Sequence, residues 1–408
     1  MRDTICSIDI GSSSTRVLVG QHDGQTLDIV GVGVVESDGV RSGAILNSEH
    51  TIRSLNRAVA EAEQMSGLSI RSAIVNISGR SIRGENSAGV VAITNKDRIV
   101  TDSDVYRVVE NARNRRIPSD HELLHVLARE FTVDDQQNLP DPVGMSGVRL
   151  EVDVHIVTAP RSHLSGLQRV ISGAGVQVDH VILSGIASAE AVLRPDEKEM
   201  GVAVIDIGGG VCDLSVHVEG GLYHTAVLPL GANHITNDLS MGLRISPEAA
   251  ETLKRNHGYA RERDVDPTEK VEVPSVHGRP AAWVLQRDVA GIIEPRITEL
   301  FELLDQQINR AVRKKMLGGG IILTGGGARV SGIADLARDI FNLPVTVAWP
   351  KQTGGLYERV NGPEFSTGVG MLLFAMRQGI GSAARSISAT SNGETIMGRL
   401  KTWLADNF

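Results

Sequence analysis

The chain has 408 residues with Lys+Arg 41 against Asp+Glu 49, a formal net charge of −8, and this balance argues against broad nucleic-acid binding. Hydrophobic residues are 41% and charged residues 22%, so we expect a globular protein with two or more packing units. No segment approaches the roughly 18 apolar residues of a membrane-spanning helix, no signal peptide is visible, and Cys6 and Cys212 give no disulfide framework, so we expect a cytoplasmic protein.

A strand, a turn of small residues and a second strand open each half of the chain. The first copy covers residues 5–20 and contains Asp9, and the second covers residues 201–216 and contains Asp206. Both copies read Asp-Ile-Gly at the turn, and amphipathic stretches follow over residues 51–65 and 233–257. This internal repeat predicts two related α/β halves that face each other.

Residues 83–163 interrupt the first half. The pattern there predicts strands over residues 88–94, 123–133 and 148–158 and a helix over 103–114. A further helix is predicted over 161–173. We interpret this block as a small α+β subdomain of its own.

The rest of the second half has its own order. Residues 251–280 are charged and rich in turn residues, and a long helical period covers 284–315. A buried strand at 321–324 enters a glycine turn, and a short strand over 345–348 and a closing helix over 368–376 follow.

Three glycine-rich turns carry the chemistry. A nucleotide triphosphate needs backbone N–H groups close to its oxygens, and only small side chains allow that approach. Serine hydroxyls and the cation of Arg16 add donors for phosphate. We expect Asp9 and Asp206 to face one another across a cleft and hold a hydrated Mg²⁺. None of the turns ends in Gly-Lys-Ser/Thr, so none is a P-loop, and a plain hairpin turn is the alternative for each alone. The candidate nucleotide ligands in the turns are Gly11, Ser12, Ser13, Ser14, Arg16, Gly208, Gly209, Gly210, Gly325, Gly326, Gly327 and Ala328.

The three turns, in this order and spacing, resemble the loops of the actin/Hsp70/sugar-kinase ATPase superfamily. Asp9-Ile10-Gly11-Ser12 resembles the first phosphate loop, Asp206-Ile207-Gly208-Gly209-Gly210 the second, and Thr324-Gly325-Gly326-Gly327-Ala328 the adenosine loop. Residues 183–191 fall where the first connecting helix is expected. Residues 251–255 resemble the segment beside the adenine ring, which adds Glu251 and Lys254 to the candidate nucleotide ligands.

Within the superfamily the chain resembles the FtsA family of bacterial cell-division actin homologues. The resemblance rests on Val273-Pro274-Ser275-Val276 with Gly278-Arg279-Pro280, on Ile293-Glu294-Pro295-Arg296, and on residues 320–326. It implies ATP and Mg²⁺ as cofactors, actin-like filaments of the chain itself, docking of the C-terminal peptide of the tubulin-like protein FtsZ, and recruitment of later division proteins. It also implies that Arg296 and Glu299 receive that peptide, and the alternative is an exposed, mutually satisfied helix pair.

The fold implied by the resemblance is an α/β, actin-like two-lobed ATPase fold made of duplicated ribonuclease-H-like domains. The extra subdomain interrupts the first lobe, and a C-terminal amphipathic helix follows on a flexible linker. The predicted ranges are 1–82 with 164–190 and 362–378 for the first lobe, 83–163 for the inserted subdomain, 191–236 with 321–361 for the second lobe, 237–320 for its smaller subdomain, 379–394 for the linker and 395–408 for the helix.

The last fourteen residues predict a helix that binds membrane. At about 100° per residue their apolar side chains occupy one arc of roughly 140°, and Arg399 and Lys401 flank it. A short helix needs a surface on which to fold, and an anionic inner-membrane leaflet would serve. The alternative is a helix that docks back on the protein's own body. The predicted membrane-binding residues are Ile396, Met397, Leu400, Trp403, Leu404 and Phe408.

The sequence assigns no general base, although Asp206 and Glu190 are candidates, so any ATP hydrolysis is expected to be slow and regulatory. The hypothesis is a peripheral protein on the cytoplasmic face of the inner membrane at the division site, where it tethers a cytoskeletal polymer. Two alternatives stay open on the turns alone: a small-molecule kinase, and an actin-like component of a pilus-assembly machine.

Overall fold

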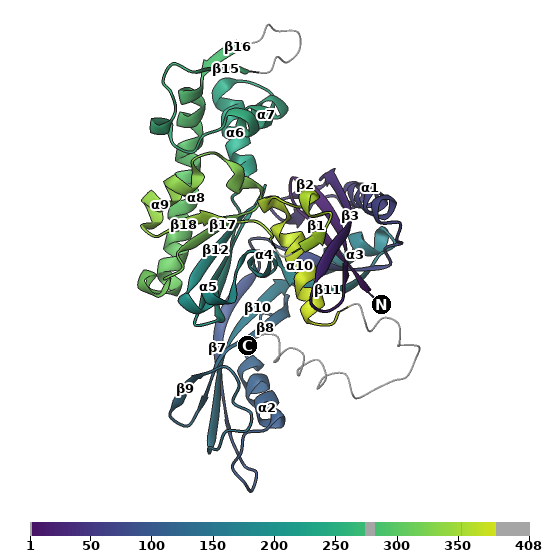
Figure 1. The fold of residues 1–408 in the computed structure, drawn as a ribbon, viewed down its shortest axis with the longest axis vertical. Coiled ribbons are helices and arrows are strands. Elements are labelled where there is room, and N and C mark those ends of the chain that lie inside the picture. The colour runs from purple at the N-terminus through teal and green to yellow at the C-terminus, as the bar shows by residue number, and fades with distance from the viewer. Residues whose placement is uncertain (1, 274–281, 352, 381–408) are drawn as a thin grey trace.

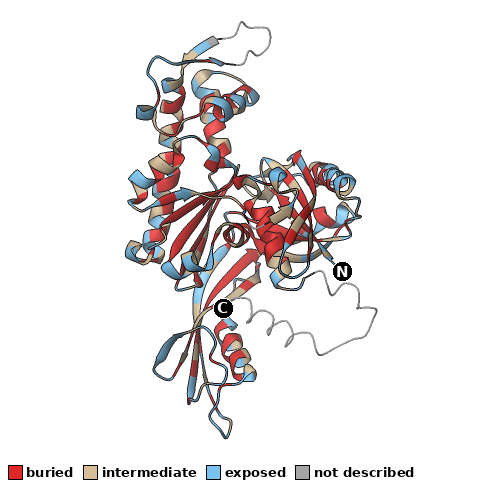
Figure 2. Cartoon of the chain, viewed as in Figure 1, coloured by how far each residue is buried: buried red, intermediate tan, exposed pale blue. Residues whose placement is uncertain are grey.

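The computed structural model describes residues 2–273, 282–351 and 353–380, and it has two lobes with a sheet each (Figure 1). The predicted linker, apart from its first two residues, and the whole predicted membrane helix lie outside the described residues. Buried residues run through both central sheets (Figure 2).

The first lobe is built on a six-stranded sheet in the order β11-β6-β1-β2-β3-β19. Strands β1, β2 and β3 are antiparallel, whereas β6 and β11 continue parallel to β1. The strands are β1 (Asp3–Ile10), β2 (Ser14–His22), β3 (Leu27–Glu36), β6 (Ser72–Ile77), β11 (Gln177–Leu183) and β19 (Thr353–Gly355).

The second lobe repeats this topology in the order β14-β13-β12-β17-β18. An antiparallel meander is again followed by parallel strands on the far side of its first strand. The internal repeat predicted from the sequence is therefore confirmed as a repeated fold. The strands are β12 (Val202–Ile207), β13 (Cys212–Val218), β14 (Gly221–Leu228), β17 (Ile321–Thr324) and β18 (Val345–Val347).

Helices cover both sheets and build the upper part of the second lobe in Figure 1. The helices outside the inserted subdomain are α1 (Ser48–Ser66), α3 (Arg161–Gly173), α4 (Ser184–Val192), α5 (Pro195–Met200), α6 (Ala232–Leu243), α7 (Pro247–His257), α8 (Gln286–Ala311), α9 (Ile333–Phe341) and α10 (Ser366–Arg377). In α1, α3 and α6 to α9, apolar side chains spaced by three and four residues place one face against a core. Helices α4 and α10 are buried over most of their length, whereas no residue of α5 is buried.

Short elements complete the lobes. They are the two-stranded sheets β4 (Val40–Arg41) with β5 (Ala44–Ile45) and β15 (Lys270–Val273) with β16 (Ala282–Leu285), and the 3₁₀ turns η1 (Glu262–Asp264), η2 (Lys314–Met316), η3 (Gly326–Arg329), η4 (Tyr357–Arg359) and η5 (Pro363–Phe365).

The inserted subdomain is a four-stranded sheet in the order β7-β10-β8-β9 with α2 (Asp102–Arg113) packed on one face. A capping box at Thr101 and Asp104 begins α2. Phe131 and Leu150 lie in a core that is separate from those of the lobes. The strands are β7 (Arg83–Ala92), β8 (His121–Val133), β9 (Gln136–Leu139) and β10 (Arg149–Pro160).

Two helices, α4 and α10, cross between the lobes. Gly370 permits the crossing, because a Cβ there would overlap the carbonyl oxygen of Ala187. One end of α10 reaches the second lobe through Ser366, whose hydroxyl lies 2.7 Å from that of Thr324, while Ser7 donates to the Gly368 carbonyl at 2.9 Å. Any change in the angle between the lobes must therefore move this pair of helices.

The structure differs from the sequence analysis in three places. The stretch 233–257 is two helices, because Arg244 adopts φ 55 and ends α6. Residues 247–257, partly assigned to a turn-rich segment, form α7. The predicted second lobe included residues 353–355, but these form β19, which pairs with β3 in the first lobe. The other domain limits stay predictions.

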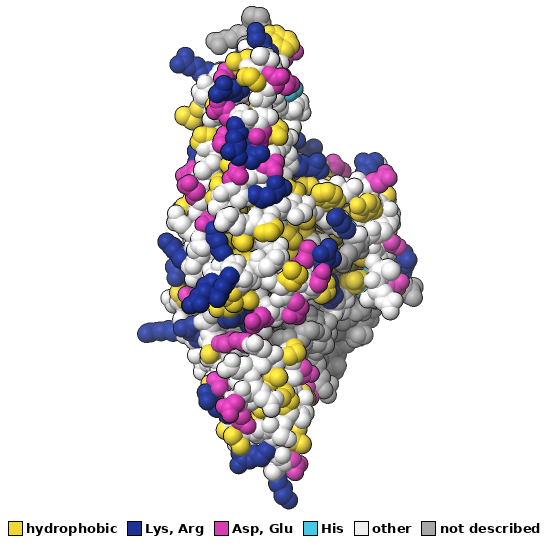
Figure 3. Space-filling model, turned by 60° about the vertical axis from the view of Figure 1, so that its left-hand side comes forward, with side chains coloured by type: hydrophobic (Ala, Val, Ile, Leu, Met, Phe, Trp, Pro, Cys, Tyr) yellow, Lys and Arg dark blue, Asp and Glu magenta, His cyan; other side chains and the backbone are white. Residues whose placement is uncertain are grey.

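Lys and Arg are interspersed with Asp and Glu over the face shown in Figure 3. Many charged side chains of the molecule form ion pairs, such as Arg261 with Asp339 at 3.1 Å. Among the described residues, no helix combines the length and apolar character needed to cross a bilayer.

Candidate nucleotide-binding cleft

The first two glycine turns touch one another between the lobes. A Cβ on Gly209 would overlap the Ser13 hydroxyl, and one on Gly210 would lie 2.6 Å from the Ser12 hydroxyl. The Ser12 hydroxyl accepts from Gly43 N at 3.1 Å. Glycine is needed here because the serine side chains of the first turn occupy the space that a Cβ would take.

The second turn is anchored on the start of α6. The N–H groups of Ala232 and Asn233 donate to the carbonyls of Gly208 and Gly209 at 2.9 and 2.8 Å. The Ser13 hydroxyl donates to Asn233 Oδ1 at 2.9 Å, so one side chain joins the first turn to the second lobe.

The third turn lies against the strand that ends at the second. Gly325 has φ 80, and a Cβ there would overlap Asp206 Oδ1. Gly327 similarly abuts Ile207, and Ala328 is buried. The fold thus brings all three turns together.

Asp9 is buried at the end of β1. Asn76 Nδ2 donates to its Oδ1 at 2.8 Å, and Arg16 Nη1 lies 3.2 Å from its Oδ2. Burial raises the pKa of Asp9 to about 6; Arg16 opposes this shift and the charge of Asp206 adds to it. The Nε of Arg16 is buried without a hydrogen-bond partner among the described residues. This donor fits an anion in the cleft.

Asp206 is buried at the end of β12. Its Oδ2 accepts from the hydroxyls of Ser188 and, at 2.9 Å, Thr367. Burial raises the pKa of Asp206, and these hydroxyls oppose that shift. A third buried carboxylate, Asp213, follows on β13 and accepts from Ser78 at 2.8 Å; burial and then Asp206 raise its pKa well above the usual value.

The donor set fits a hydrated magnesium ion. Among the residues that the structure describes, no three His, Cys, Asp or Glu side chains meet closely enough to hold a metal directly. Asp9 and Asp206 are near enough for one charge to raise the pKa of the other carboxyl. Two such carboxylates suit Mg²⁺, which retains several of its waters.

Glu251 and Lys254 lie on α7 against the start of α6. Lys254 Nζ donates to the Ala232 carbonyl at 3.0 Å and to Thr236 at 2.7 Å, and it pairs with Glu251 at 2.6 Å. Burial lowers the pKa of Lys254, and Glu251 opposes that shift. This pair of a buried lysine and a half-buried glutamate therefore lies beside the helix on which the second turn is anchored.

The contacts of Glu190 do not favour a role as a general base. Its two oxygens bind Lys198, at 2.7 Å, and Arg377. Burial raises its pKa, but these two cations outweigh burial and leave the pKa below its usual value. The proton affinity of Glu190 is thus reduced, and its contacts tie α4 to α5 and α10.

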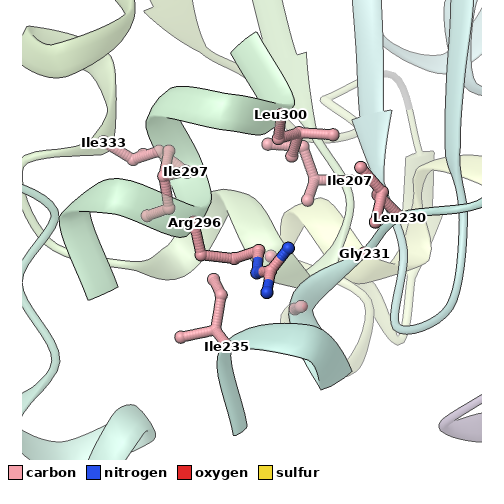
Figure 4. Close-up of a pocket in the computed structure, with 10 residues that line it drawn as sticks. Ile207, Leu230, Gly231, Ile235, Arg296, Ile297, Leu300 and Ile333 are labelled. Atoms are coloured by element: carbon pink, nitrogen blue, oxygen red, sulfur yellow. The ribbon is translucent and has the colours of Figure 1, made fainter. Parts of the chain in front are cut away.

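Arg296 and Glu299 form the ion pair that the sequence spacing allowed. Arg296 also binds Asp238 of α6 in two places, at 2.6 and 3.1 Å. Its stem lines a small cavity of about 10 Å³ between α6, α8 and the glycine turns (Figure 4). Both partners of Arg296 are acidic, so an acidic ligand would compete with them.

Sequence reasoning missed three buried polar residues that bind Asp9 or Asp206, and a third buried carboxyl beside them. Asn76, Ser188 and Thr367 lie far from the turns in sequence, and nothing in their local patterns marks them. Asp213 had a signal, since it lies seven residues after Asp206 and alternation on the second strand points it to the same face.

Solved structures share this two-lobed arrangement. A chain of a PilM-PilN type IV pilus biogenesis complex has a TM-score of 0.66 at 16% identity, over 91% of this chain and 98% of that one. MreB5 of Spiroplasma citri bound to ADP has a TM-score of 0.54 at 14% identity, over 94% of this chain and 99% of that one. The fold is therefore actin-like.

The family follows from closer relatives. A profile described as "Cell division protein FtsA" matches residues 203–370, and one described as "SHS2 domain inserted in FTSA" matches residues 79–158. Cell division protein FtsA of Pseudomonas aeruginosa is 39% identical over 99% of this chain and 98% of its own length. Cell division protein FtsA of Escherichia coli strain K12 is 35% identical over 100% of this chain and 99% of its own length. The chain belongs to the FtsA family and is an actin-like cell-division protein.

Proposed function

We propose that this chain binds ATP with Mg²⁺ in the cleft, forms actin-like filaments, and joins the FtsZ polymer to the cytoplasmic face of the inner membrane at the division site, where it recruits later division proteins. The convergence of three glycine turns on two buried carboxylates carries the nucleotide part of the proposal. The family assignment favours cell division over a small-molecule kinase or a pilus component.

In the proposed complex the turns supply backbone N–H groups, and the serines of the first turn supply hydroxyls. Arg16, whose Nε has no hydrogen-bond partner among the described residues, would donate to phosphate oxygens, while Asp9 and Asp206 would accept hydrogen bonds from waters around the metal. Mg²⁺ would neutralise phosphate charge. Glu251, Lys254 and the third turn flank the base and sugar.

Nucleotide titration tests the cleft. Gly209→Ala places a methyl group against Ser13, so we expect ATP affinity to fall at least tenfold. Gly166→Ala, on α3 with nothing within 4 Å of the new Cβ, is the matched control and should bind ATP like the parent chain. Equal affinities for the two variants would contradict the proposal.

The Arg296 surface is the proposed site for the C-terminal peptide of FtsZ. Arg296→Ala should abolish peptide binding measured by fluorescence anisotropy. Arg287→Ala is the control, because Arg287 lies on the same helix and also pairs with an acidic residue, Glu262, at 2.6 Å. Peptide binding that survives in the Arg296 variant would exclude this surface.

The membrane part rests on residues 395–408. Sedimentation with vesicles of anionic lipid, in the presence of ATP and Mg²⁺, should pellet the full chain and leave a chain ending at Glu394 in the supernatant. If the full chain stays in the supernatant at low salt while it binds ATP, the tethering role is wrong, and rapid phosphorylation of a small substrate would then be the next activity to assay.

A further inference from the structure

Asn76 lies next to Asp9 in the middle of the first-lobe sheet. Strand β6 pairs parallel with β1, Ser7 opposite Ile74 and Ile8 opposite Val75, so Asn76 comes one step further along the same register. Asn76 is 6% exposed, and the other buried residues of β6 are apolar. A side-chain amide buried there is costly unless each of its polar atoms has a hydrogen-bond partner.

Every polar atom of this amide has a partner. Ile10 N donates to Asn76 Oδ1 at 2.8 Å, and Nδ2 donates to Asp9 Oδ1 at 2.8 Å and to Ser184 Oγ at 3.1 Å. A backbone N–H can only donate, so the Ile10 contact identifies the oxygen of the amide and directs its NH₂ group to the Asp9 carboxylate.

These contacts meet three parts of the cleft. Ile10 immediately precedes Gly11 of the first turn, Asp9 is the proposed metal-site carboxylate, and Ser184 begins α4, one of the two helices between the lobes. Arg16 holds the other oxygen of Asp9, so Asn76 and Arg16 together fix the plane of this carboxylate. Without Asn76, Asp9 Oδ1 and the Ile10 N–H would both lose their partner.

We propose that Asn76 is a positioning residue, which holds Asp9 and the start of the first phosphate turn in the geometry that Mg²⁺ and nucleotide require. The metal part of this inference rests on the proposed function, whereas the hold on the turn does not.

Two substitutions separate the charge from the hydrogen bonds. Asn76→Asp places a carboxyl oxygen opposite that of Asp9. At a pH at which both carboxyls are ionised, the hydrogen-bond donor is lost and a like charge is added. Asn76→Ser is neutral and too short to bridge Ile10 and Asp9, and it gives the same comparison if the aspartate variant does not purify. Val75→Ala is the control, because Val75 is a buried neighbour on β6 whose side chain lies on the opposite face of the sheet.

The first measurement uses the full chain without nucleotide. Hydrogen exchange gives the ratio of the Ile10 amide exchange rate to the Ile8 amide exchange rate. This ratio should be at least tenfold higher in the Asn76→Ser variant than in the parent chain. In the Val75→Ala variant both amides should change together, since that substitution lowers stability without removing the Ile10 contact. An unchanged Ile10-to-Ile8 ratio in the serine variant would overturn the role of Asn76 in holding the turn.

The second measurement is the ratio of ATP affinities with Mg²⁺ and with chelator. We expect this ratio to fall at least tenfold in both Asn76 variants and to stay unchanged in Val75→Ala. If a folded Asn76 variant has the same ratio of ATP affinities as the parent chain, the metal part of the inference is wrong. A parent chain that binds no ATP would instead refute the proposed function, and the exchange ratio would still decide whether Asn76 holds the turn.

Discussion

Asp9→Asn tests whether the buried, ionised carboxylate of Asp9 destabilises the folded chain. Burial raises the pKa of Asp9 from 3.8 to about 6. Each pKa unit corresponds to about 1.4 kcal/mol, so ionised Asp9 lowers the free energy of unfolding by about 3 kcal/mol at pH 7. Between pH 4 and 6 the folded chain binds a proton at Asp9 that the unfolded chain has released, and stability therefore falls as pH rises through this window.

Asparagine cannot ionise and removes this pH dependence. Loss of the Arg16 contact adds a constant offset, but the stability of the variant minus that of the parent should rise by about 3 kcal/mol from pH 4 to pH 7 and then level off. Urea unfolding of the nucleotide-free chain, followed by circular dichroism, measures the difference. A difference that is flat over this range would refute the reasoning about Asp9. The variant should also lose the added stability that Mg²⁺ and ATP give the parent chain, a separate test of the metal site.

The remaining predictions concern the helices between the lobes. Gly370→Ala forces α10 away from the Ala187 carbonyl and should lower stability by about 1–3 kcal/mol in thermal unfolding, whereas Gly166→Ala should raise it by up to about 1 kcal/mol; equal shifts would contradict the crossing geometry. Glu190→Gln removes two ion pairs and should cost about 1–2 kcal/mol while ATP affinity and any ATPase rate stay unchanged. A large loss of ATPase rate in a stable Glu190 variant would restore Glu190 as a candidate base.

Long periodic segments and turns were readable from the sequence because their signals are local. The predicted helix over 161–173 agrees with α3, since the 3.6-residue period of its apolar residues is a property of the segment alone. The two Asp-Ile-Gly turns predicted a repeat, and five strands of each sheet confirm it, while β19 is an additional strand of the first sheet. Where a single residue decides, the pattern was insufficient: Arg244 in the left-handed region splits one amphipathic stretch into two helices.

The sequence by itself determined the family, the two-lobed fold and the turns that bear glycine, because these follow from short motifs, each made of neighbouring residues, and from the order and spacing of those motifs along the chain. Only the tertiary structure decided which polar groups surround the carboxylates. Asn76 reaches Asp9 across 67 residues and Thr367 reaches Asp206 across 161, so their partners depend on the register of parallel strands and on the place where α10 crosses. Burial, which raises the pKa of both carboxyls, is likewise a property of the assembled lobes and not of any segment.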